Sequence, residues 1–197
     1  MNAMNNYDVE GARGLLEFRE RSIISLNEGQ RLGAVDDILV DPGSLRLHAL
    51  VTAKSGLLRP EINAIPQSEI VLWGLDVVLV KRGDALVKRD SLTGLEPCLS
   101  AFRSIPGRDV ISLSGDRLGE MRDLLITPQG ELAGFAVDHV RGELAELLGS
   151  ERRGERRSSY RLPVSAINSF GRDVLMVDLS KVRGMVPPAQ ASAEEVK

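Results

Sequence analysis

The chain has very little of three residue types that often carry chemistry. Its 197 residues include a single cysteine, Cys98, two histidines and only 4% aromatic residues. A lone cysteine excludes an intrachain disulfide and is typical of a reducing compartment. So few aromatic side chains make a base-stacking surface for single-stranded nucleic acid hard to build. These shortages exclude a disulfide-stapled fold and disfavour nucleic-acid binding through stacking.

Charge and hydrophobicity give no strong signal for a polyanionic partner or a membrane. The net charge is −3, which argues against a generally nucleic-acid-binding surface. The most apolar run, residues 70–80, has about half the length that a helix needs to cross a bilayer, and it contains Asp76. Residues 1–10 are polar and lack the basic-then-apolar layout of a signal peptide. We therefore expect a soluble, cytoplasmic protein.

One pattern occurs twice and dominates the sequence. It covers residues 29–40 and residues 115–126, with glycine, Arg-Leu-Gly, aspartate and leucine in the same order. The two copies are separated by a constant offset, as the paired aspartates Asp37 and Asp123 show (123 − 37 = 86). A repeat this specific predicts two copies of one structural unit.

A second shared block follows the first at a larger offset. Residues 63–70 correspond to residues 160–167, and their prolines are 97 positions apart (163 − 66 = 97). The second copy therefore carries about 11 more residues between its middle strands (97 − 86 = 11). We place this insertion at residues 140–159, where residues 143–148 favour a short helix.

The residue patterns of the two copies predict the same order of short strands. In the first copy, residues 45–54 alternate between apolar and polar positions, as in a half-buried strand. The other expected strands of this copy cover residues 21–26, 32–40, 61–65 and 77–81, with a helical turn at residues 66–70. Short strands without a long helix predict an all-β fold of two tandem small antiparallel β-barrels with short helical turns.

Composition suggests where these units begin and end. Glycine and proline between the copies indicate a connection, and the proline- and alanine-rich end of the chain favours disorder. The expected organisation is a flexible N-terminal segment (1–20), a first barrel (21–88), a connector (89–106), a second barrel (107–180) with the insertion at 140–159, and a disordered tail (181–197).

The repeated blocks carry a family resemblance. The pattern Gly-x-Arg-Leu-Gly-x-Val-x-Asp-Ile-Leu-Val at residues 29–40 precedes Ile-Pro-x-Ser-x-Ile at 65–70 and Gly-x-Asp-Val-Val-Leu-Val at 74–80. This combination resembles the PRC-barrel family over most of residues 21–81 and 107–179. The family includes the cytoplasmic domain of the photosynthetic reaction-centre H subunit and the C-terminal domain of a bacterial ribosome maturation factor. The resemblance implies a tandem PRC-barrel protein, built of non-catalytic barrels that dock onto larger assemblies.

The repeat residues are expected to have structural roles. The glycines lie between two strands, with no following helix N-terminus, so turn and bulge geometry is favoured over a phosphate-binding loop. The aspartates are expected to accept backbone N–H bonds at the neighbouring turn. The predicted structural turn residues are Gly29, Gly33, Asp37, Pro66, Gly115, Gly119, Asp123 and Pro163.

No residue pattern predicts catalysis, a cofactor or a metal. His48 and His139 occupy non-equivalent positions and have no cysteine near them in the sequence. No serine lies in a nucleophile-elbow pattern. We therefore expect a protein that is not an enzyme and that holds no cofactor and no metal.

The insertion is the most distinctive part of the second copy. It contains two Arg-Arg pairs, Arg152–Arg153 and Arg156–Arg157, which suit phosphate or carboxylate partners. These arginines are candidates for docking on a partner protein, a ribosomal particle or RNA. A solvated loop, partly neutralised by its glutamates, is the other interpretation.

The leading functional hypothesis is a non-enzymatic adaptor or scaffold that binds other proteins and supports assembly of a larger complex. The alternatives are a ribosome- or RNA-maturation factor and an accessory protein of a photosynthetic membrane complex. The sequence leaves open whether the chain forms a homo-oligomer or whether its two barrels pack as an intrachain pseudo-dimer.

Overall fold

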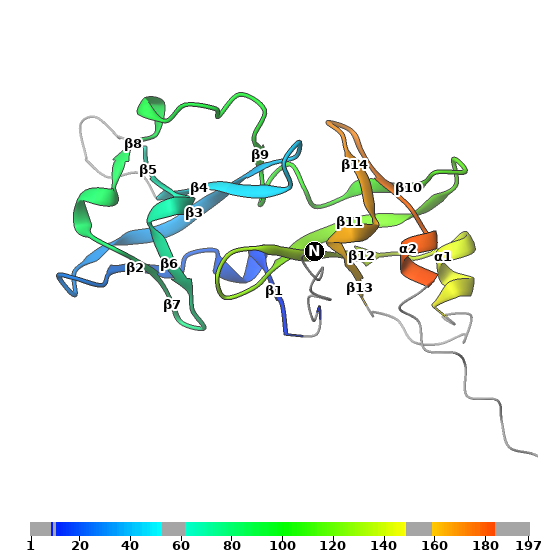
Figure 1. The fold of residues 1–197 in the computed structure, drawn as a ribbon, viewed down its shortest axis with the longest axis horizontal. Helices are drawn as coiled ribbons and strands as arrows, with labels where there is room; N and C mark the ends of the chain where they lie inside the picture. Colours follow the sequence, from blue (N-terminus) through cyan, green and yellow to red (C-terminus); the bar gives the residue numbers. More distant parts are fainter. Residues whose placement is uncertain (1–8, 10, 53–61, 149–158, 184–197) are drawn as a thin grey trace, which may run out of the picture.

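A computed structural model describes residue 9 and residues 11–52, 62–148 and 159–183. These residues form two curled β-sheets, one built mainly from each half of the chain (Figure 1). The predicted all-β fold of two tandem barrel-like units with short helical turns is confirmed. Over the described ranges, no helix has the length and apolar character needed to cross a membrane.

The first sheet has the strand order β6-β7-β2-β3-β4-β5-β8, and β9 pairs with β3. Its strands are β2 (Ser22–Ser25), β3 (Arg31–Asp41), β4 (Arg46–Thr52), β5 (Asn63–Pro66), β6 (Ile70–Trp73), β7 (Val77–Val80), β8 (Val87–Lys88) and β9 (Leu99–Ser100). Short 3₁₀ turns occur at η2 (Gln67–Glu69), η3 (Gly83–Ala85) and η4 (Arg89–Ser91).

The second sheet has the strand order β13-β12-β11-β10-β15-β14, and β1 pairs with β11. Its strands are β1 (Arg13–Gly14), β10 (Arg108–Ser112), β11 (Arg117–Ile126), β12 (Leu132–Asp138), β13 (Tyr160–Pro163), β14 (Ile167–Phe170) and β15 (Val174–Val177). The helical elements are η1 (Leu15–Phe18), α1 (Gly142–Leu147), η5 (Val164–Ala166) and α2 (Ser180–Arg183).

One detail of the strand pairing differs from the expected antiparallel barrels. Each sheet contains one parallel pair, β2 with β7 and β10 with β15. In each copy several strands lie in the sequence between the two members of this pair, and such a long return allows a parallel neighbour. The sheets are therefore mixed.

Two short segments, 86 residues apart, occupy equivalent places on opposite sheets. We call Val9 with residues 11–18 the N-terminal arm and residues 95–104 the connector arm. In the N-terminal arm, Arg13 is the Cα partner of Ile126 on β11. In the connector arm, Leu99 is the Cα partner of Val40 on β3. Both pairs obey the repeat offset, because 99 − 13 and 126 − 40 both equal 86.

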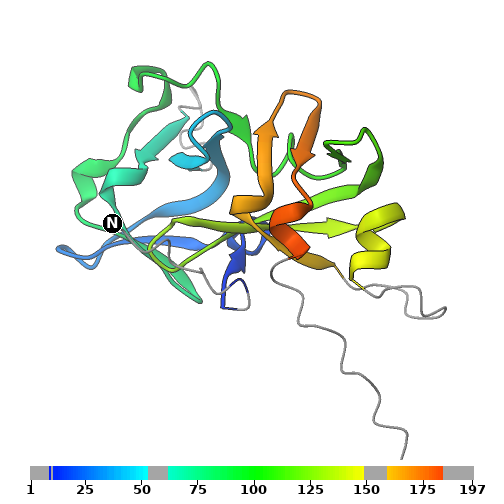
Figure 2. The ribbon, with the colours of Figure 1, turned by 45° about the vertical axis from the view of Figure 1, so that its right-hand side comes forward.

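The arms are exchanged between the halves. The N-terminal arm precedes the first half in the sequence but completes the second sheet, and the connector arm precedes the second half but completes the first sheet. Figure 2 shows the dark-blue N-terminal arm beside the yellow-green strands of the second half. Each sheet therefore depends on a segment that belongs, by sequence order, to the other copy.

The arms also cover the outer faces of the sheets with apolar residues. On the second sheet, Val9 and Ala12 of the N-terminal arm pack with Leu125, Ala133 and Ala136. The first sheet carries the equivalent cluster. Its strand residues Leu39, Ala49, Val51 and Ala64 are covered by Leu92, which precedes the connector arm, and by Leu95 and Cys98 within the arm. The repeat therefore begins earlier in the chain than the motif at residues 29–40.

These observations correct two expected boundaries. Within residues 1–20, which we expected to be flexible, the side chains of Leu15 and Phe18 are fully buried. Residues 89–106 are more than a connector, since they contribute β9 to the first sheet. Both segments are ordered because they bury apolar side chains and pair with strands of the other copy.

The two halves share one hydrophobic core that contains residues from both sheets and from both arms. Phe18 of the N-terminal arm packs edge-to-face on Trp73 of β6, with ring centroids 5.1 Å apart. The backbone N–H of Trp73 also donates to the carbonyl of Pro128, in the turn between β11 and β12. The two barrel-like halves therefore pack on each other through one shared core.

Candidate functional site

The two repeat aspartates hold the exchanged arms in place. Asp37, at 5% exposure, accepts hydrogen bonds from the connector arm: the Ser100 hydroxyl donates at 2.6 Å and the Phe102 N–H at 3.4 Å. Asp123, at 6% exposure, accepts the N–H of Leu16 in the N-terminal arm on both oxygens, at 3.1 and 3.3 Å. Both carboxylates thus fasten an arm to a sheet.

This arrangement corrects the expected source of the hydrogen bonds. We expected the aspartates to accept N–H groups at the neighbouring turn. Asp37 does accept the adjacent N–H of Ile38, at 2.8 Å, but the donors just described come from segments 63 to 107 residues away in the chain. The aspartates join the two halves, whereas a turn-capping role would be local.

We call each repeat aspartate, together with the arm residues that donate to it, an anchor. The anchor of the second half, at Asp123, lacks the hydroxyl donor that the anchor at Asp37 has. Gly14 is the counterpart of Ser100 at the repeat offset (100 − 86 = 14). Gly14 lies beside the Asp123 carboxylate, and a Cβ added to it would overlap the carboxylate Oδ2. A Cβ at this position would force the Asp123 side chain to move, and the carboxylate of Asp123 receives no side-chain hydroxyl from Gly14.

The charged residues beside the two anchors are reversed in sign. In the first half, Arg103 of the connector arm forms an ion pair with Asp36 of β3 at 3.5 Å. The corresponding residues of the second half are Glu17 and Arg122 (103 − 86 = 17; 36 + 86 = 122). The first half therefore spans its anchor with an ion pair, and the second half presents the opposite charges at the same two places.

In the second half, each of these charges has a different partner. Glu17 accepts the N–H of Gly14 at 3.2 Å and pairs with Arg13 at 3.3 Å. Arg122 donates to the Ser159 hydroxyl at 3.2 Å and pairs with Asp138 at 3.5 Å. Glu17 is thus bound to residues of the N-terminal arm, and Arg122 to residues of the second sheet and the chain just before β13.

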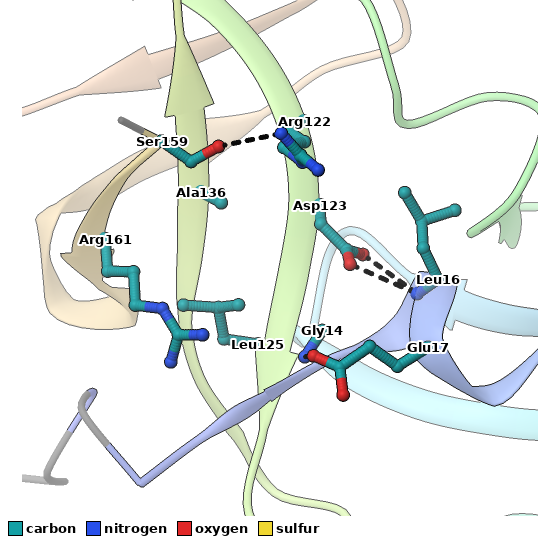
Figure 3. A pocket seen from close by; sticks show the side chains of 9 residues that line it. All are labelled: Gly14, Leu16, Glu17, Arg122, Asp123, Leu125, Ala136, Ser159 and Arg161. Carbon is teal, nitrogen blue, oxygen red and sulfur yellow. Dashed lines mark hydrogen bonds between the residues drawn. The ribbon is translucent and has the colours of Figure 1, made fainter. Parts of the chain in front are cut away.

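A pocket of about 490 Å³ lies between the N-terminal arm and the second sheet. Figure 3 shows Arg122 and Asp123 as neighbours on β11, with Asp123 turned toward Leu16 of the arm, Glu17 on the arm and Arg161 on the far side of the pocket. Arg161 is fixed to the arm, since it donates to the Ala12 carbonyl at 2.7 Å. The lining residues are Gly14, Leu16, Glu17, Arg122, Asp123, Leu125, Ala136, Ser159 and Arg161.

Burial raises the pKa of Asp123 to about 7, because the enclosed site disfavours its charged form. The N–H of Leu16 opposes this effect by favouring the carboxylate, and the nearby negative charge of Glu17 adds to it. The side chain therefore exchanges a proton near neutral pH. A carboxyl group that titrates there can accept a proton from, or respond electrostatically to, whatever enters the pocket.

The other predicted residues lie away from this pocket. Gly29 and Gly115 have positive φ in equivalent turns, and Gly33 and Gly119 lie opposite irregularities of strand register. Pro66 and Pro163 immediately precede 3₁₀ turns. The candidate partner-binding arginines, Arg152, Arg153, Arg156 and Arg157, lie outside the described residues.

The histidines and the cysteine also lie apart from the pocket. His48 contacts the carbonyl of Thr93 through Nε2, at 2.9 Å. Burial raises the pKa of the Cys98 thiol, and its Sγ donates to the carbonyl of Gly94. In the part of the chain that the structure covers, no three His, Cys, Asp or Glu side chains gather in a way that could hold a metal ion.

Sequence reasoning identified Asp123 but missed the rest of the pocket. Arg122 and Arg161 lie within the repeated blocks but are not shared by the other copy, and the arm residues Gly14 and Glu17 differ from their counterparts in the connector arm. One signal for the arms is the repeat offset of 86 residues. Applied before residue 21, it aligns two small residues, Ala12 and Cys98. That signal is too weak to define a strand.

The chain matches no protein-family model, and no curated protein matches it well enough to count as a relative. The resemblance to PRC-barrel proteins therefore stays a prediction, based on the repeated motif.

Proposed function

We propose that this chain is a non-enzymatic scaffold, which binds other proteins and supports assembly of a larger complex. The observation that carries the proposal is the exchange of the arms. Each arm is fastened to the other copy by strand pairing and by a buried aspartate. Such an interlocked body holds its two ends at a fixed separation, which is the property that a scaffold needs.

Equivalent apolar tips support docking at both ends. Leu26 lies in the turn between β2 and β3 and is 57% exposed, and Leu113 lies in the turn between β10 and β11 and is 55% exposed. These turns lie at opposite ends of the longest axis of the molecule (Figure 1). Burying one leucine in a partner contributes about 1.5–3 kcal/mol. Two such contacts on a rigid body favour a partner, or a pair of partners, that spans it.

The experiment is photo-cross-linking in the source cells. A photo-reactive residue replaces Leu26 or Leu113 in the full chain, and Asp84, an exposed polar residue of η3, serves as the control position. We expect defined adducts from both leucine positions and none from position 84. The proposal fails if the leucine positions give no adduct above the control, or if the purified chain turns over a metabolite.

Substitution then tests whether both ends contribute. We expect the double variant Leu26→Ser/Leu113→Ser to lose the cross-linked partner from affinity capture, and each single variant to retain part of it. The alternative functions, in ribosome or RNA maturation or beside a photosynthetic complex, stay predictions. The first of them depends on Arg152–Arg157, which the structure does not describe.

A further inference from the structure

We propose that the pocket of the second half binds a small zwitterion of the α-amino-acid class. The ligand makes a hydrogen bond to the repeat aspartate and an ion pair, two contacts that the first half makes with its own side chains. The first half is the internal reference for this inference, since its anchor is built from the same elements at an offset of 86 residues. The inference does not rest on the proposed scaffold function.

The first contact is a donor to the repeat aspartate. In the first half, the Ser100 hydroxyl donates to Asp37 at 2.6 Å. In the second half, Gly14 supplies no hydroxyl, and the pocket lies beside it. Asp123 and Glu17 both line the pocket beside Gly14, although the Cβ position of Gly14 itself overlaps Asp123 Oδ2 and is not free for a ligand. An ammonium group has three N–H donors and can serve two carboxylates from this side of the pocket.

The second contact is an ion pair across the anchor. In the first half, a cation on the arm pairs with an anion on the strand, Arg103 with Asp36. In the second half, the arm carries the anion Glu17 and the strand carries the cation Arg122, with the pocket between them. A ligand that bridges them needs a cation toward the arm and an anion toward the strand. The guanidinium of Arg122 suits a carboxylate, which can accept two parallel N–H bonds.

Size and wall chemistry are consistent with this ligand class. A volume of about 490 Å³ falls in the range of small-molecule sites. Leu125 and Ala136 supply an apolar part of the wall against which a small aliphatic side chain can pack. The ammonium also places a positive charge beside Asp123, which is 6% exposed, and so offsets the loss of solvation of its ionised form.

The test is calorimetric titration of the full chain at pH 8. The probes are glycine, alanine, serine and leucine, and ethylamine and propionate each supply only one of the two charged groups of alanine. We expect saturable binding of at least one amino acid, with ethylamine and propionate at least tenfold weaker. We also expect tighter binding at pH 8 than at pH 6, because the raised pKa of Asp123 leaves it largely protonated at the lower pH.

Matched variants separate the pocket from the rest of the surface. Arg122→Gln and Glu17→Gln should each weaken binding at least tenfold, whereas Arg103→Gln and Asp36→Asn, at the equivalent places of the first half, should leave it unchanged. Far-ultraviolet circular dichroism verifies that each variant is folded. The inference is overturned if none of the amino acids binds below about 10 mM, if ethylamine binds as well as alanine, or if the first-half variants weaken binding equally.

Discussion

The replacement Asp123→Asn is expected to raise the unfolding free energy, relative to that of the wild type, more at pH 8 than at pH 5. Asp123 is almost fully buried, and burial raises its pKa from 3.8 to about 7 in the folded state. Between these two values the folded chain keeps a proton that the unfolded chain has released. The stability contributed by this group is therefore fully present below about pH 4 and is lost as the pH rises through 7.

The size of the effect follows from the difference between the two pKa values. A difference of about 3 pH units corresponds to about 4 kcal/mol of folding free energy lost across that range. Asparagine cannot ionise, and its amide oxygen can still accept the N–H of Leu16. The variant should therefore gain on the wild type by up to about 4 kcal/mol as the pH rises. If the new N–H₂ group finds no acceptor, the variant loses about 1–3 kcal/mol at every pH, which leaves this pH-dependent gain unchanged.

Urea unfolding at a series of pH values between 4 and 8 measures this directly. The informative quantity is the difference in unfolding free energy between variant and wild type, because the other titrating groups contribute equally to both. Asp37→Asn is the matched control for the cost of an amide at a repeat aspartate. A difference that stays constant from pH 5 to pH 8 would refute the assignment of Asp123 as a buried carboxyl that titrates near neutrality.

Three further predictions concern the arms and the insertion. Gly14→Ala should lower the unfolding free energy by about 1–3 kcal/mol, because its Cβ overlaps the Asp123 carboxylate, and thermal melting checks this. Phe18→Ala should cost about 3–5 kcal/mol and shift a single unfolding transition of both halves, as seen by tryptophan fluorescence and circular dichroism together. Alanine at Arg152, Arg153, Arg156 and Arg157 should weaken any salt-dependent co-sedimentation with ribosomal particles in a gradient; sedimentation of the unaltered protein entirely at the top at low salt would contradict that alternative.

The sequence was sufficient to predict most strands of the first copy, though not β6 and β8, because turn residues and alternating apolar positions are local signals. The alternation over residues 45–54 corresponds to β4, and the helical turn after Pro66 corresponds to η2. Repetition of the motif then predicted a second copy of the same unit. These parts of the fold depend on short-range patterns, which a single sequence contains.

The exchange of the arms could not be predicted in the same way. β1 and β9 are two residues long, so they have no periodicity to detect. The choice between pairing with the near copy and pairing with the far copy is made by tertiary packing, as the burial of Leu15 and Phe18 against both halves illustrates. The pocket depends on this exchange, since Gly14 and Glu17 reach Asp123 only because the N-terminal arm lies on the second sheet.

The most direct test of the exchanged arms is nuclear Overhauser contacts between backbone protons of the full chain. The structure predicts contacts of Arg13 with Ile126 and of Leu99 with Val40. An arrangement without exchange would instead give contacts of Arg13 with Val40 and of Leu99 with Ile126. Observation of the first set supports the interlocked pseudo-dimer, and observation of the second set would contradict it.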